Sequence, residues 1–142
     1  MRDNISFTEK LRNSGIRPTK QRIKICEVLF NQKETFHFTI GDLAKMIEEK
    51  QNQKISLATV YNTVHAFKEK GYLKEITINS NKCYFDTNTT DHHHFYDEDK
   101  GKLIDAKSED IETIKINKNL NNKKIKSVEV LVRVATDNHN QK

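Results

Sequence analysis

The sequence predicts an α+β fold, in which an N-terminal winged helix-turn-helix is followed by a small α/β domain. Helical periodicity occupies most of residues 7–70, a hairpin pattern follows, and short strand patterns separated by polar turns occupy the rest. We place the two domains at residues 1–85 and 86–142. Three short strands make a poor independent core, so we expect the second domain to pair with a second copy of the chain.

The first half should begin with three helices. A short helix is expected over residues 7–14. Pro18 opens a second helix, over residues 18–30, because the missing N–H of proline is not needed in a first turn. Thr39 caps the third helix, and the apolar residues between 40 and 47 then recur at helical spacing.

The fourth helix, residues 56–70, is the expected recognition helix. Ser56 caps it and Gly71 ends it. Its buried stripe should comprise Leu57, Val60, Val64 and Phe67, which leaves Thr59, Tyr61, Asn62 and His65 toward the outside. A hairpin of residues 72–78 and 82–85 would form the wing.

The second half reads as short strands. They are expected over residues 92–96, 102–106 and 127–134, and residues 111–116 suit either a short helix or a strand.

Charge is distributed unevenly. Residues 1–75 carry 14 Lys or Arg against 9 Asp or Glu, whereas residues 86–112 carry 3 against 9. A basic front segment suits a polyanion and an acidic middle segment suits a cation, although solvated faces look the same. No run is apolar enough for a membrane partner or a signal peptide, and Cys26 and Cys83 form no disulfide framework. A cytoplasmic protein is the simplest interpretation.

In a helix-turn-helix the second helix enters the major groove of double-stranded DNA. Asn62 can read adenine, while Thr59 and Tyr61 can touch thymine methyls or phosphates. Positive side chains placed to hold phosphates are Arg17, Lys20 and Arg22, with Lys82 on the wing. The alternative is that Tyr61 and His65 pack against neighbouring helices.

The run Asp91-His92-His93-His94 predicts a metal site. On a strand, His92 and His94 share one face and His93 points to the other. Two imidazoles with carboxylates nearby suit Fe²⁺, Mn²⁺ or Zn²⁺, and a polar strand is the alternative.

Two motifs carry a family resemblance. Arg-Pro-Thr-Lys-Gln-Arg at residues 17–22 and Ala-Thr-Val-Tyr at residues 58–61 resemble signatures of the ferric uptake regulator family. The resemblance covers about residues 8 to 134. It implies a homodimer that binds inverted-repeat operators, with Tyr61 in the recognition helix.

The resemblance also implies a regulatory metal site. The matching positions are His37, Asp86, His92, His94 and Asp105, and each holds a competent ligand. A nitrogen and oxygen set without thiolate favours Fe²⁺ or Mn²⁺, with Zn²⁺ able to bind in vitro. An ion held from both halves could select a DNA-competent arrangement.

The chain departs from the family where a CxxC pair usually holds structural zinc. Asp97 and Lys100 stand there, so no cysteine-ligated zinc is expected. His93 and Glu112 are candidate ligands for a second metal or haem site.

With CxxC missing, the phrase from Phe85 to Phe95 most resembles the iron response regulator branch, which senses iron through haem. Haem is therefore a candidate cofactor and a haem-delivering protein a candidate partner. The chain lacks the Cys-Pro haem motif of some members.

Our main hypothesis is a metal- or haem-responsive repressor of iron homeostasis, not an enzyme. The alternative is a peroxide-responsive regulator that uses the same iron site. The missing zinc site argues mildly against this alternative. A non-haem iron enzyme with His92, His94 and Asp105 as a facial triad is disfavoured, because it leaves the helix-turn-helix idle.

Overall fold

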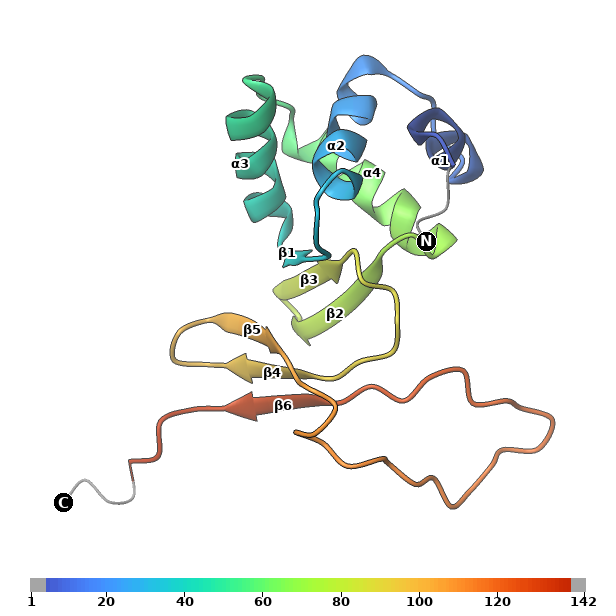
Figure 1. The fold of residues 1–142 in the computed structure, drawn as a ribbon, viewed down its shortest axis with the longest axis vertical. Helices are drawn as coiled ribbons and strands as arrows, with labels where there is room; N and C mark the ends of the chain where they lie inside the picture. Colours follow the sequence, from blue (N-terminus) through green and yellow to red (C-terminus); the bar gives the residue numbers. More distant parts are fainter. Residues whose placement is uncertain (1–4, 139–142) are drawn as a thin grey trace. The chain divides into compact units, whose positions relative to one another are not determined.

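The structure, a computed structural model, describes residues 5–138 of the chain. The chain divides into two compact units, Met1–Thr89 and Thr90–Lys142. Four helices and a three-stranded sheet form the first unit, and a second three-stranded sheet forms the other (Figure 1). This arrangement confirms the predicted α+β class with its N-terminal helices. No helix within the described residues is long and apolar enough to cross a membrane.

The helices of the first unit are α1 (Phe7–Asn13), α2 (Lys20–Phe30), α3 (Ile40–Gln51) and α4 (Leu57–Lys70). The predicted start of α2 at Pro18 was wrong. The side chain of Thr19 accepts a hydrogen bond from the Arg22 N–H and caps the helix, so Pro18 lies outside it.

Local signals at α3 and α4 are confirmed. Thr39 and Asp42 form a reciprocal capping box, and the Ser56 hydroxyl accepts from the Thr59 N–H. Gly71 ends α4 with φ of 90°, in the left-handed region where glycine carries no Cβ penalty. These signals fix the start of α3 and both ends of α4, the two helices that flank the turn at residues 52–56.

Apolar side chains from all four helices form one core. On α4, Val60, Val64 and Phe67 are fully buried, as predicted. Leu57 is 60% exposed, so its predicted burial was wrong. Periodicity sets which face of a helix is apolar, but it does not set how far along the helix the core extends. Leu57 is the first residue of α4, and the core begins one turn later.

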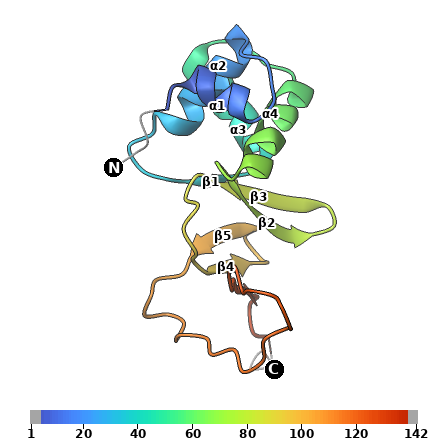
Figure 2. The same cartoon turned by 90° about the vertical axis from the view of Figure 1, so that its right-hand side faces the viewer.

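The sheet of the first unit has the order β1-β3-β2, with both pairs antiparallel. Its strands are β1 (His37–Phe38), β2 (Lys74–Asn79) and β3 (Lys82–Asp86). The helices lie on one side of this sheet in both views (Figures 1 and 2). The predicted hairpin of β2 and β3 is confirmed. The two-residue strand β1 pairs with β3 on the side opposite β2.

The second unit is a sheet of order β5-β4-β6, made of β4 (His94–Asp97), β5 (Lys102–Asp105) and β6 (Leu131–Val134). The strands predicted over residues 92–96 and 127–134 are both shorter than expected. The Val130 N–H donates to the His93 Nδ1 atom. It is therefore not available for the backbone hydrogen bond that would extend β6 toward its N-terminus. Residues 111–116 form neither helix nor strand, and lie in the long connection drawn in orange in Figure 1.

Candidate functional site

Three predicted ligands converge in the second unit. The Asp105 Oδ1 atom lies 3.1 Å from the His94 Nε2 atom and 3.7 Å from the His92 Nε2 atom. The two imidazole centroids are 4.4 Å apart. His92, His94 and Asp105 each offer a ligand atom, and these atoms lie within 4.8 Å of one another. Two imidazole nitrogens and a carboxylate suit a divalent transition metal.

The sheet explains this convergence. β4 and β5 pair antiparallel with His94 directly opposite Asp105, which places both side chains on one face. His92 lies two residues before His94, outside β4, and its side chain still reaches the same face. His94 is buried, whereas the Asp105 side chain is 56% exposed, so the cluster opens to solvent on the carboxylate side.

The hydrogen bonding of His92 sets its tautomer. Its Nδ1 atom lies 2.7 Å from the Thr90 carbonyl oxygen. A carbonyl only accepts, so Nδ1 carries a proton, and Nε2 is the ring nitrogen that lies toward the Asp105 carboxylate. A backbone carbonyl that accepts from the other ring nitrogen is typical of a metal-ligating histidine.

The other two predicted ligands, His37 and Asp86, lie together in the first unit. They are register partners in the β1–β3 pair, as the last residue of β3 meets the first of β1. The His37 ring packs edge-on against Tyr84 at 5.8 Å. Asp86 is 1% exposed, and one of its oxygens accepts from the Asn88 N–H. A buried carboxylate needs such partners, and a cation is the strongest of them.

His93 lines a cavity of about 390 Å³ in the second unit, together with His92, Asp91 and Glu112. Its Nδ1 atom accepts from the Val130 N–H at 2.9 Å, which leaves Nε2 as the donor-bearing nitrogen of the neutral ring. His93 and Glu112 therefore share a cavity, as candidates for a second site should.

Neither cysteine suits a thiolate ligand. Desolvation by burial raises the pKa of Cys26 to about 12. Desolvation also raises the pKa of Cys83, with the Glu75 carboxylate adding to the effect. Both side chains remain thiols at neutral pH.

The predicted DNA-reading face of α4 is solvent-exposed at its centre. Tyr61 is 50% exposed and Asn62 is exposed as well. The His65 ring lies between Tyr61, at 4.1 Å, and Phe85, at 5.4 Å. His65 is therefore a packing residue, although its partners are its own helix and β3, and not a neighbouring helix as the packing alternative had it. Leu57, which periodicity alone had assigned to the core, adds an exposed apolar side chain to the same helix.

The remaining predicted DNA contacts divide into two kinds. Arg17 and Lys20 are exposed beside the start of α2. Arg22 and Thr59 are half-buried and make local bonds: the Arg22 guanidinium donates to the Arg17 carbonyl, and the Thr59 hydroxyl accepts from Ser56. These two residues stabilise the helix starts on which any DNA contact would depend.

Comparison with known proteins extends over both units. Residues 13–134 match the ferric uptake regulator family. The chain is 40% identical over 97 residues to the peroxide operon regulator of Bacillus subtilis, a match covering 68% of this chain and 65% of that protein. It is 36% identical over 95 residues to a peroxide-responsive repressor of Staphylococcus aureus, covering 67% and 62%. The chain thus matches less than two thirds of the length of these relatives.

Solved structures share the fold. The ferric uptake regulator of Pseudomonas aeruginosa, solved with manganese, has a TM-score of 0.66 at 18% identity and covers 93% of this chain and 98% of its own. The ferric uptake regulator of Vibrio cholerae has a TM-score of 0.67 at 22% identity and covers 91% and 98%. At this level of identity the likeness concerns the fold.

Two hypotheses change with these findings. The curated relatives named above are peroxide regulators, so the resemblance to the iron response branch and the haem cofactor gain no support from them. The facial-triad enzyme is set aside, because the match is to a family of regulators. The family motifs, the shared fold and the match over residues 13–134 agree, and the chain belongs to the ferric uptake regulator family.

Proposed function

We propose that this chain is a metal-dependent DNA-binding repressor that responds to peroxide. The observation that carries the proposal is the convergence of His92, His94 and Asp105, with the Nε2 atoms of both rings within 3.7 Å of the carboxylate. Similarity to two peroxide-responsive regulators supports the signal. Peroxide thus replaces haem as the preferred effector, and the DNA partner, the homodimer and the metal remain as predicted.

The proposed regulatory ion is Fe²⁺ or Mn²⁺, held by His92, His94 and Asp105 from the second unit and by His37 and Asp86 from the first. His94 and Asp105 are paired residues of one sheet, His92 lies two residues before the β4 strand of that sheet, and His37 and Asp86 are paired residues of the other. Imidazole and carboxylate ligands suit these two ions better than they suit the structural binding of zinc. Zn²⁺ would also bind in vitro, because its affinity for such ligands is high.

The ligand set gives binding of the ion a consequence for the whole chain. Because the ligands belong to two units, an ion bound by all five stabilises those arrangements in which both sheets present their ligands together. If these are the arrangements that bind an operator, loss of one ligand releases DNA. The equilibrium shifts only by the difference in metal affinity between arrangements.

Peroxide sensing requires a redox-active ion and an oxidisable ligand. Fe²⁺ held by these residues would donate an electron to cleave the O–O bond of H₂O₂ and would recover it when the imidazole carbon is oxidised. Overall, one peroxide oxygen is inserted at an imidazole C–H carbon of His37 or His92, the carbon is oxidised and water leaves. The modified ring is a poorer ligand. The exposed Asp105 side chain shows that the cluster in the second unit is reachable by a small solute.

The test compares two metal forms of the full chain. After treatment with H₂O₂, peptide mass spectrometry of the Fe²⁺ form should find one added oxygen on His37 or His92, with loss of binding to operator DNA. The Mn²⁺ form is the control, and both its mass and its binding to operator DNA should be unchanged. Equal oxidation of the two forms, or oxidation that leaves DNA binding unchanged, would contradict peroxide sensing.

The recognition helix gives a second prediction. Tyr61→Ala should weaken binding to an operator, selected from a random DNA pool with the wild-type protein, by about 10- to 100-fold. The exposed ring would then be lost from the base-reading face. Tyr61→Phe keeps the ring stacked on His65 and is the matched control, with a smaller loss expected. Gel-shift titrations measure both, and equal affinities for all three proteins would exclude Tyr61 from the interface.

A further inference from the structure

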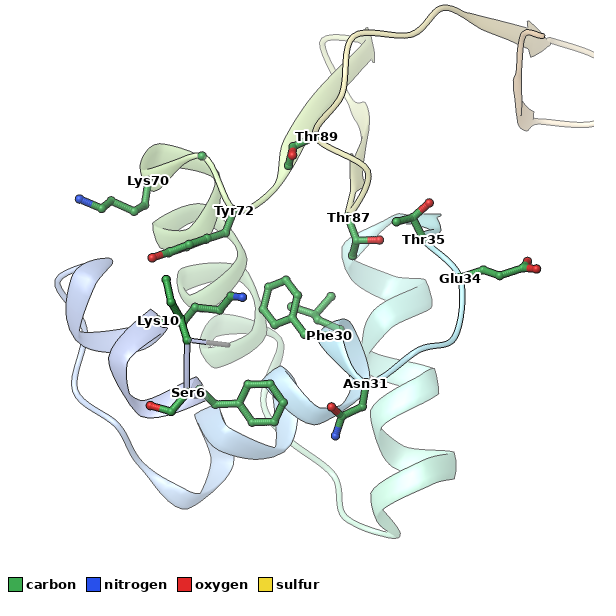
Figure 3. A pocket seen from close by; sticks show the side chains of 14 residues that line it. Ser6, Lys10, Phe30, Asn31, Glu34, Thr35, Lys70, Tyr72, Thr87 and Thr89 are labelled. Carbon is green, nitrogen blue, oxygen red and sulfur yellow. The ribbon is translucent and has the colours of Figure 1, made fainter. Parts of the chain in front are cut away.

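A cavity of about 850 Å³ in the first unit lies apart from the residues assigned above to metal and DNA. It lies where α1, the end of α2 and the end of α4 meet (Figure 3). Its volume falls within the range of small-molecule sites in proteins. We propose that it binds a small aromatic carboxylate.

Three aromatic side chains form one part of the cavity wall, and polar side chains make up most of the rest. Phe7 and Phe30 lie with their ring centroids 6.5 Å apart, and Tyr72 lines the cavity at the end of α4. The Tyr72 hydroxyl accepts from the Asn13 side chain at 3.3 Å, which holds the ring at the edge of the cavity. Rings at such separations offer faces and edges to a planar guest, and each aromatic contact adds to the area that the guest buries.

A single ammonium group lies between these rings. The Lys10 Nζ atom is 4.5 Å from the centroid of Phe30 and 5.1 Å from that of Tyr72. Figure 3 shows Lys10 directed across the cavity, whereas the side chains of Lys70 and Glu34 point away from it. Aromatic faces stabilise a cation by their quadrupole, but they do not neutralise its charge.

No carboxylate among residues 5–138 forms an ion pair with Lys10. Within the described part of the chain, Glu34 is the one acidic residue that lines the cavity, and its side chain is directed outward. The aromatic part of the cavity, with a cation that pairs with no carboxylate of residues 5–138, is complementary to a guest with an apolar body and one negative charge. A carboxylate would make a charge-assisted hydrogen bond to Lys10, while its aromatic body packs between the rings.

The same features exclude other ligand classes. A cationic guest would be repelled by Lys10. A neutral aromatic guest would fill the cavity without the charge-assisted bond, and so it should bind more weakly. An anionic, a neutral and a cationic aromatic guest of the same shape should therefore bind with different affinities.

Isothermal titration of the metal-free, DNA-free full chain tests this with three naphthalene probes. Naphthoate should bind saturably at one site, and neutral naphthylmethanol at least about tenfold more weakly, which corresponds to about 1.4 kcal/mol. Naphthylmethylammonium should not bind. Equal affinity for the three probes, or no saturable binding of naphthoate, would overturn the proposal. The proposed regulator function would be unaffected, since neither metal nor DNA is present.

Variants then locate the site. Lys10→Met keeps the apolar stem without the charge and should lose about tenfold in naphthoate affinity, whereas Lys10→Arg should retain it. Lys45→Met, an exposed position on α3, is the matched control and should bind as the wild type does. Naphthoate should shift the ring NMR signals of Phe30 and Tyr72 in the wild-type chain, a readout that needs no variant to fold. Binding that leaves these signals unmoved would place the probe elsewhere.

Discussion

The His92→Ala/His94→Ala variant is expected to bind Mn²⁺ more than about 100-fold more weakly than the wild-type chain. Loss of a group that only orients a ligand costs 10- to 100-fold in metal affinity, and this variant loses two of the proposed ligands themselves. Asp105 would then lose the two imidazole nitrogens that now lie within 3.7 Å of its Oδ1 atom. Isothermal titration with Mn²⁺ measures the effect.

The matched control is His93→Ala, because His93 belongs to the same histidine run but its Nδ1 atom accepts a hydrogen bond from the Val130 N–H. It should retain most of the Mn²⁺ affinity at the regulatory site. The same variants should separate in a thermal melt: Mn²⁺ should raise the melting temperature of the control but not of the double variant, since a ligand stabilises only the state that binds it. An unchanged Mn²⁺ affinity in the double variant would remove these histidines from the metal site.

The Phe67→Ala variant is expected to lose about 3–5 kcal/mol of the free energy of unfolding of the first unit. Phe67 is fully buried on α4, and its ring packs edge-on against Phe30 at 5.4 Å and Tyr72 at 6.0 Å. Truncation removes these contacts and leaves a cavity that the surrounding helices fill only in part. Because a domain is stable by only about 5–15 kcal/mol, much of the helical unit would unfold on mild heating.

Urea unfolding followed by far-ultraviolet circular dichroism measures this loss, since every helix in the described residues belongs to the first unit. Leu57→Ala is the control on the same helix. It truncates an apolar side chain that is 60% exposed, so the change should stay within about 0.5 kcal/mol. A similar free energy for the two variants would mean that the α4 stripe contributes less to stability than its burial implies.

Elements with strong local signals were predictable. The caps at Thr39 and Ser56 and the end of α4 at Gly71 depend on hydrogen bonds and backbone angles within a few residues, and all three are confirmed. Pro18 was misassigned because two local signals compete there, and the Thr19 cap defines the start of α2. The strand ends were also misjudged, because pairing with a distant segment decides them.

The candidate site shows the same division. The spacing of His92 and His94 and their match to the family's ligand positions could be predicted from the sequence. The opposition of His94 to Asp105 depends on the register of β4 and β5, and that of His37 to Asp86 on a two-residue strand too short to recognise in advance. The cavity around Lys10 was not foreseen, because its walls come from helices far apart in sequence.

The sequence by itself determined the class of fold, the helix-turn-helix, the family and the residue types of a nitrogen and oxygen metal site, since these follow from periodicity, caps and motifs along the chain. Only the tertiary structure decided the rest. It brought His92, His94 and Asp105 within ligand distance, exposed Leu57, and enclosed Lys10 between aromatic rings. The physical reason is that local hydrogen bonds and side-chain period are written in neighbouring residues, whereas register and packing depend on segments that meet only when the chain has folded.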